Sequence, residues 1–237
     1  QDAICLSVDM QYGHFWGLVE AWSRDGESMV MWADRLETWV DISAKQAEFH
    51  VPDDCVMVDA GNWRSEVAAQ CVQHGHATNS RLWWEKWSCW WAMLGDDAHS
   101  FTYSYLERGE KKTKRLPYSW EPEAFDPCFG QHTDAALRKL TQGRKCPTIR
   151  WSNPTIKDIM GSRRQALMEG KLAFVAKGAS EHFARHIFSE AKMPDPKNLG
   201  KMKWAPKSKK LPNHLWDCWC QSAVFAARRR IIRAFGE

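Results

Sequence analysis

The sequence predicts an α/β domain with a mixed β-sheet of five or more strands and helices on both faces. Segments with alternating apolar and polar residues open the chain, and segments with helical periodicity follow them. The composition agrees, because 44% hydrophobic and 26% charged residues are usual for a globular protein and exclude a disordered tail or a fibre. At 237 residues we expect a single domain over 1–237, since α/β domains reach this size.

An antiparallel meander of three strands is expected first. The segments 4–8, 14–22 and 28–33 have the alternation of half-buried strands. Asp25-Gly26 stands between the last two, and this pair favours the positive φ that a tight hairpin needs.

A helix at 39–49 and a fourth strand at 55–59 follow the meander. The fourth strand ends in Asp59 as the first ends in Asp9. A helical crossover makes the two strands parallel, and neighbouring strands lie about 4.8 Å apart. We therefore expect Asp9 and Asp59 side by side at one edge of the sheet.

The remaining elements are expected to complete the sheet and to add an insertion at about 97–150. Residues 117–147 contain four prolines and are expected to be mainly loop. In order, we expect a helix from Gly61-Asn62 to Gly75, a strand at 90–94, a hairpin of 101–106 and 111–116 turning on Arg108-Gly109, a helix from Asn153-Pro154 to Met168, a strand at 172–176, a helix opening at Ser180, a basic linker at 197–210 and a last helix from Asn213 to about Ala234.

Asp217 stands among apolar residues of the last helix, close to the expected core. An unpaired carboxylate there would cost several kcal/mol. A metal ion, a basic partner or the dipole of the helix N-terminus would compensate the charge. His214 and Gln221, three residues before and four after, share its helix face.

Three carboxylates, Asp9, Asp59 and Asp217, are what a pair of Mg²⁺ or Mn²⁺ ions requires. Hard divalent cations prefer oxygen ligands, and two such ions activate a water and stabilise the leaving oxygen of a phosphodiester. The alternative is that the aspartates at the strand ends are caps or turn residues.

Several stretches of the chain form a recognisable set. They read Ser7-Val8-Asp9-Met10-Gln11, Val58-Asp59-Ala60-Gly61, Trp151-Ser152-Asn153, Ile156-Lys157-Asp158 and Asn213-His214-Leu215-Trp216-Asp217-Cys218. Together they resemble the nuclease domain of phage terminase large subunits of the lambda-like kind. The likeness spans most of the chain, is strongest at the opening strand and the last helix, and is poor at about 95–150.

The resemblance implies a ribonuclease-H-like fold and an endonuclease that cuts concatemeric viral DNA during packaging with two divalent metal ions. Asp9, Asp59 and Asp217 match the metal-binding acids of that family, and His214 is expected to orient water or the scissile phosphate. The implied partners are double-stranded DNA, an ATPase domain in the same polypeptide, the small terminase subunit and the portal. The implied compartment is the cytoplasm of the infected bacterial host.

Two departures from the family pattern bear on the site. Many relatives have lysine before the glycine after the fifth strand, where this chain has Leu94-Gly95, which argues against a phosphate contact there. Asp96 is instead considered as a supplementary ligand. Gly170-Lys171 lacks the residues of a phosphate-binding loop, so this chain itself is not expected to hydrolyse ATP.

Clustered cations are expected to bind DNA, and salt should then weaken the binding steeply. The alternative to DNA binding is that these cations only form a solvated surface. The cations of the hairpin could equally protect an exposed sheet edge from pairing with another strand. The residues expected to contact DNA are Lys201, Lys203, Lys207, Lys209, Lys210, Lys111, Lys112 and Arg115.

The cysteines and the chain ends give the remaining expectations. The eight cysteines form no Cys-x-x-Cys pair, which favours a reduced, intracellular protein. No apolar run is long enough for a membrane span. Because the chain begins with Gln1, we expect a domain of a longer polypeptide.

Two other classes of function stay open on the sequence. One is another ribonuclease-H-like nuclease, of the junction-resolvase or transposase type, which would prefer branched substrates. The other is a DNA-binding or docking module of a packaging motor that does not cleave.

Overall fold

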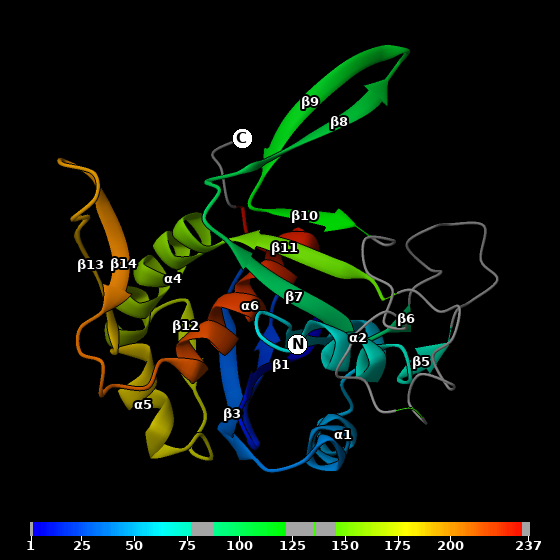
Figure 1. The fold of residues 1–237 in the computed structure, drawn as a ribbon, viewed down its shortest axis with the longest axis vertical. Helices are drawn as coiled ribbons and strands as arrows, with labels where there is room; N and C mark the ends of the chain where they lie inside the picture. Colours follow the sequence, from blue (N-terminus) through cyan, green and yellow to red (C-terminus); the bar gives the residue numbers. More distant parts are fainter. Residues whose placement is uncertain (1, 77–87, 122–134, 136–145, 234–237) are drawn as a thin grey trace.

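The computed structural model describes residues 2–76, 88–121, 135 and 146–233 (Figure 1). At its centre lies a mixed eight-stranded sheet in the order β10-β11-β7-β4-β1-β2-β3-β12. Three further pairs of strands, β5-β6, β8-β9 and β13-β14, lie outside it. The predicted α/β class with a mixed sheet is confirmed. Within the described part, no helix has the length and apolar character that crossing a membrane requires.

The predicted antiparallel meander is confirmed. The first and third strands are longer than expected, and the second has the expected bounds. Gly26, at φ +84°, closes the turn between the second and third strands. The first two strands are almost wholly buried, so they form the middle of the core. The three strands are β1 (Ala3–Gln11), β2 (His14–Trp22) and β3 (Ser28–Leu36).

The predicted parallel pairing of the first and fourth strands is also confirmed. Helix α1 (Trp39–Glu48) begins at a capping box made by Thr38 and Asp41. A short 3₁₀ turn, η1 (Asp53–Cys55), leads into β4 (Val56–Asp59), in which Val58 lies opposite Val8 of β1.

The segment after β4 forms a shorter helix than expected. Helix α2 (Arg64–Cys71) ends before Gly75, which instead lies in β5 (Gly75–His76), paired with β6 (Ser88–Cys89). The next strand, β7 (Trp91–Asp96), pairs parallel to β4 as the fifth strand of the predicted sheet.

The predicted hairpin after β7 is confirmed and stands away from the sheet (Figure 1). Arg108 and Gly109 both adopt positive φ, at 51° and 86°, which gives the tight turn. Its strands are β8 (Phe101–Glu107) and β9 (Glu110–Leu116).

The expectation of loop at 117–147 is wrong at the start of that segment, and the adjoining strand was missed. β10 (Tyr118–Glu121) pairs antiparallel with β11 (Thr148–Ser152), and β11 pairs parallel with β7. Two segments of the predicted insertion, β10 and the start of β11, therefore belong to the main sheet. Prolines obscured these strands because Pro117 and Pro147 stand just before them, where proline is tolerated. Residues 122–134 and 136–145 of the insertion lie outside the described residues.

The last third of the chain follows the prediction except in its basic segment. The expected linker at 197–210 contains a strand that pairs with the residues before it, and the last helix ends at Arg228; residues 234–237 lie outside the described part. Ser152, not Asn153, caps the first of these helices. The elements are α4 (Asn153–Met168), β12 (Ala173–Val175), α5 (Glu181–Ile187), β13 (Glu190–Pro194), β14 (Met202–Pro206) and α6 (His214–Arg228).

Helices cover both faces of the sheet, as predicted. Phe15 and Trp16 are neighbours on β2 and so point to opposite faces. The Phe15 ring packs on Trp39 of α1 at 4.7 Å, whereas the Trp16 ring stacks over His214 of α6 at 6.1 Å. Helix α6 crosses β1 and β2, with α4 and α5 packed beside it.

A buried polar network fastens α6 to the sheet. The Glu20 carboxylate of β2 accepts hydrogen bonds from Trp219 Nε1, at 2.9 Å, and from the Ser222 hydroxyl. Burial raises the pKa of Glu20, and the donated hydrogen bonds offset part of this rise. The network fixes the position of α6, and with it the residues at its start, against β1.

Candidate active site

Asp9 and Asp59 lie at matched positions of two parallel strands. Each directly follows a member of the Val8–Val58 pair in the β1–β4 register. Asp9 is only 6% exposed. The register of β1 and β4 therefore places the two aspartates at one edge of the sheet, as predicted.

Asp9 joins the sheet to the first turn of α6. Its Oδ2 lies 2.8 Å from His214 Nδ1 and accepts a hydrogen bond of 2.9 Å from Gln11 Nε2. His214, predicted to orient water or phosphate, thus has its ring orientation set by a carboxylate.

Asp217 is held by a compact polar network under the start of α6. Lys157 Nζ of α4 lies 3.1 Å from Asp217 Oδ1 and 2.9 Å from an oxygen of the buried Glu190. Asn213 Nδ2 donates to the same two carboxylates, at 2.9 and 2.8 Å. Of the compensations expected from the sequence, a basic partner is present.

The charges of the three aspartates influence one another. Burial raises the pKa of Asp59 to about 7, and the negative charges of Asp9 and Asp217 contribute to the rise. Burial likewise raises the pKa of Asp217 to about 6, with a contribution from Asp9, although Lys157 acts in the opposite direction. These contributions agree with the geometry, in which the β1–β4 register and the contact of His214 with Asp9 bring the start of α6 to the strand ends that carry Asp9 and Asp59.

The donor set fits a hard divalent cation by its chemistry. Carboxylate oxygens are the preferred ligands of Mg²⁺ and Mn²⁺, and the mutual repulsion of the three aspartates would be relieved by a cation. Each carboxylate meanwhile has a protein partner, which for Asp59 is the backbone N–H of Gly61 at 3.3 Å. Among the residues that the structure describes, no three acidic, histidine or cysteine side chains are drawn together into a ready-made metal-binding group.

A histidine that the sequence reading missed holds the start of α6. Nδ1 of His186 accepts a 3.1 Å hydrogen bond from the Leu215 backbone N–H, which requires that nitrogen to be unprotonated. Burial lowers the pKa of His186 to about 4, and neighbouring His214 and His182 lower it further. Neutral His186 therefore accepts a backbone N–H in the first turn of α6, after the N-cap Asn213, and helps to place His214 beside Asp9.

Four further residues of the site were also not predicted from the sequence: Lys157, Glu190, Asn213 and Gln11. The sequence offers a weak signal for Lys157, which follows Ile156 on the buried side of α4. Glu190 gives none, because it opens a strand that the pattern did not predict.

Asp96 has other neighbours. Its Oδ1 accepts a 2.8 Å hydrogen bond from the backbone N–H of Ala98, and its Oδ2 lies 3.8 Å from Arg150. Its role as a supplementary ligand stays a prediction.

The lysines of the predicted linker lie on or beside the β13–β14 hairpin, which packs on α4. Trp204 Nε1 donates a 2.7 Å hydrogen bond to Asp158, and the Trp204 ring lies against Gly161, where a side chain would collide with it. Since α4 also carries Lys157, the hairpin is anchored on the helix that reaches the acidic site. The predicted cations Lys201, Lys203, Lys207, Lys209 and Lys210 are exposed.

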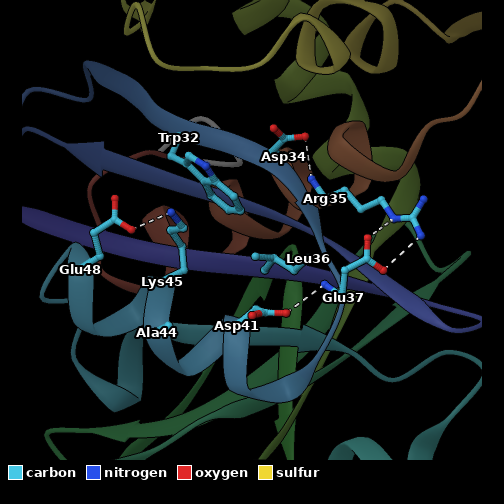
Figure 2. Close-up of a pocket in the computed structure, with 9 residues that line it drawn as sticks. All are labelled: Trp32, Asp34, Arg35, Leu36, Glu37, Asp41, Ala44, Lys45 and Glu48. Carbon is cyan, nitrogen blue, oxygen red and sulfur yellow. Dashed lines mark hydrogen bonds and ion pairs between the residues drawn. The ribbon is translucent and has the colours of Figure 1, made fainter.

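A cleft of about 460 Å³ lies elsewhere, between β3 and α1 (Figure 2). It is on the sheet face opposite α6, and four of its charged side chains form ion pairs, Arg35 with Glu37 and Lys45 with Glu48. Asp41 belongs to the capping box of α1. Lys45 Nζ also lies 4.6 Å from the centre of the Trp32 ring. These ion pairs and the place of the cleft on the sheet face opposite α6 make it a poor candidate for catalysis.

Comparisons of the chain with models of protein families, with curated proteins and with solved structures find no match.

Proposed function

We propose that the chain is a metal-dependent endonuclease domain with a ribonuclease-H-like fold, similar to the nuclease domain of lambda-like terminase large subunits, that cuts double-stranded viral DNA concatemers during packaging. The observation that carries the proposal is geometric: Asp9 and Asp59 directly follow the paired Val8 and Val58 of β1 and β4, and His214, one turn before Asp217 on α6, lies 2.8 Å from Asp9. The central strand order β3-β2-β1-β4-β7, with only β2 antiparallel to the rest, supports it as the order expected of that fold.

In this proposal the three aspartates would hold Mg²⁺ or Mn²⁺. A pair of such ions, when bound, supplies an activated water and stabilises the leaving oxygen of the phosphodiester. Asp9 fixes the His214 ring through Nδ1, so Nε2 is the atom with which His214 would meet the phosphate or its water. Lys157 and Asn213 hold the Asp217 carboxylate in place and reduce its repulsion from Glu190.

The proposal predicts metal-dependent nicking. Supercoiled plasmid is expected to become nicked and linear when the chain is supplied with Mn²⁺ or Mg²⁺, and to stay intact in EDTA. The measurement is gel electrophoresis over a titration of each metal, with linear and four-way-junction DNA as parallel substrates. A strong preference for the junction would favour the resolvase or transposase type.

A second candidate is a DNA-binding module of the packaging motor that does not cut. The observation favouring it is that each aspartate already has a protein partner in the structure. DNA retained on a gel with no cleavage at any metal concentration would select this candidate.

The shared charge of the site also predicts an unusual effect on stability. The folded-state pKa of Asp59 is about 7, against an unfolded value of about 3.9. The native state therefore binds more protons than the unfolded state between these values, and the Asp59 contribution lowers stability as pH rises through that window. Asp59→Asn should stabilise the metal-free protein at pH 8, on the order of 2 kcal/mol.

Urea unfolding in EDTA at pH 8 and at pH 4 measures this effect. The gain in stability of Asp59→Asn over the wild type should shrink toward pH 4. Excess Mn²⁺ at pH 8 should reduce the difference in stability between the two proteins, because it stabilises the wild type alone. The same change at the exposed Asp25 serves as the control and should alter stability little. If Asp59→Asn were no more stable than the wild type at pH 8, the raised pKa of Asp59 and its repulsion by the neighbouring carboxylates would be contradicted.

A further inference from the structure

The β8–β9 hairpin is an exposed arm whose base lies next to the candidate site. It stands away from the main sheet (Figure 1), and most of its side chains are open to solvent. Just before it, the backbone carbonyl of His99 accepts a 2.5 Å hydrogen bond from Thr155 in the first turn of α4. Lys157 of the same helix forms an ion pair with Asp217, so the arm is attached to an element of the candidate site.

The strand register divides the cations of the arm between two faces. Residues opposite each other in an antiparallel pair share a face, and neighbours along a strand alternate. Lys114 lies opposite Tyr103 and Lys112 opposite Tyr105, so these four residues form one face, named here the tyrosine–lysine face.

Two further cations, Lys111 and Arg115, lie on the other face, where there are no aromatic rings, and Arg108 stands in the turn. Lys111 is opposite Leu106, and Arg115 is opposite Thr102. The sequence had grouped Lys111, Lys112 and Arg115 as a single set of DNA contacts. The register instead gives two faces of different charge and chemistry: the tyrosine–lysine face also carries Glu107 and Glu110, whereas the face with Lys111 and Arg115 has no acidic residue.

The two rings of the tyrosine–lysine face are arranged as a platform. Tyr103 and Tyr105 lie 6.2 Å apart with their planes only 15° from parallel. Lys114 Nζ lies 5.8 and 5.9 Å from the two ring centres. Tyr103 is 49% exposed, so its ring is accessible to a ligand.

We propose that the tyrosine–lysine face binds single-stranded DNA, with bases stacked on Tyr103 and Tyr105 and phosphates contacted by Lys112 and Lys114. Aromatic rings beside cations are the usual means of holding an unpaired strand, because every base has a face on which to stack. A duplex hides those faces, so it could use only the lysines. Between residues 101 and 116 the arm has five basic and two acidic side chains, which suits a polyanion.

This binding goes beyond the proposed duplex cleavage and does not depend on it. A plain guard against edge-to-edge pairing would need the charges of the arm, but it would not need tyrosine rings. The rings of Tyr103 and Tyr105 are therefore the feature to test. Binding is measured in EDTA so that no metal-dependent cleavage can occur.

The experiment measures fluorescence anisotropy of a labelled oligo-dT strand and of a labelled duplex of the same length. The double change Tyr103→Ala with Tyr105→Ala is expected to weaken single-strand binding roughly tenfold or more. Duplex binding should stay within about twofold, because it would use phosphate contacts alone. Changing both tyrosines to Phe keeps the rings and should retain single-strand affinity.

Charge-matched variants separate the two faces. Lys112→Ala with Lys114→Ala should weaken single-strand binding several-fold more than Lys111→Ala with Arg115→Ala. Glu107→Gln removes the acid that pairs with Lys112 and should tighten single-strand binding. Unchanged single-strand affinity in the folded Tyr→Ala variant, an equal loss for duplex, or equal effects of the two cation pairs would overturn the proposal.

Discussion

Asp9→Asn is expected to reduce Mn²⁺-dependent nicking of plasmid by roughly three orders of magnitude while leaving the fold intact. The amide keeps the size of the side chain but loses the negative charge that a divalent cation requires. Asp9 also faces His214 at 2.8 Å, so the change removes the carboxylate that orients the ring. Asp217→Asn should have a similar effect, because its charge belongs to the same acidic neighbourhood.

The rate of nicking on agarose gels is the measurement, and circular dichroism with thermal melting checks the fold. Asp25→Asn is the matched control, since Asp25 is exposed in the turn between β2 and β3 and should cut at the wild-type rate. Full activity of Asp9→Asn or Asp217→Asn would remove that residue from the catalytic set. Wild-type activity that persists in EDTA would exclude the metal-dependent mechanism altogether.

Lys157→Met should cause the largest loss of stability among the residues near the site. The Lys157 ammonium is 12% exposed and lies between the carboxylates of Asp217 and Glu190. Removing one partner of a buried ion pair leaves uncompensated charge and typically costs about 3–5 kcal/mol. Burial lowers the pKa of Lys157, but the Asp217 and Glu190 charges outweigh burial and leave it raised. The stabilisation is therefore fully present below the ordinary lysine pKa, including neutral pH, and is lost only in strong alkali.

Urea unfolding at pH 7 measures the loss, and Lys192→Met is the matched control. Lys192 pairs with Asp158 of the same helix, but this pair is about half exposed and should contribute less than about 1 kcal/mol. Adding Glu190→Gln to Lys157→Met should recover part of the loss by removing one unpaired charge. Equal effects of Lys157→Met and Lys192→Met would show that the buried network does not stabilise the fold.

The sequence predicted the part of the fold that local patterns determine. The meander, α1, β4, β7 and the β8–β9 turn were recognisable because alternation, capping and Asp-Gly or Arg-Gly turns are properties of neighbouring residues. Asp9 and Asp59 could be placed together because parallel strands that both end in aspartate bring these ends to one edge.

The missed features depend on contacts between distant segments. β10 and β11 are short and preceded by prolines, and only their places in the sheet make them strands. The β13–β14 hairpin was predicted as a basic linker because lysines dominate its sequence and Trp204 is its single large aromatic residue. The contact of Trp204 with α4 cannot be seen in the sequence. Glu190 and Lys157 meet Asp217 only in the folded chain, so no spacing in the sequence connects the three.

An anomalous difference map from a crystal of the chain soaked in manganese would show whether the three aspartates bind metal. We expect anomalous peaks bound by the carboxylates of Asp9, Asp59 and Asp217, and no such peaks in an Asp9→Asn crystal treated in the same way. A map with no peak among the three aspartates, with Asp9 still bonded to His214 and Asp217 still paired with Lys157, would contradict this expectation.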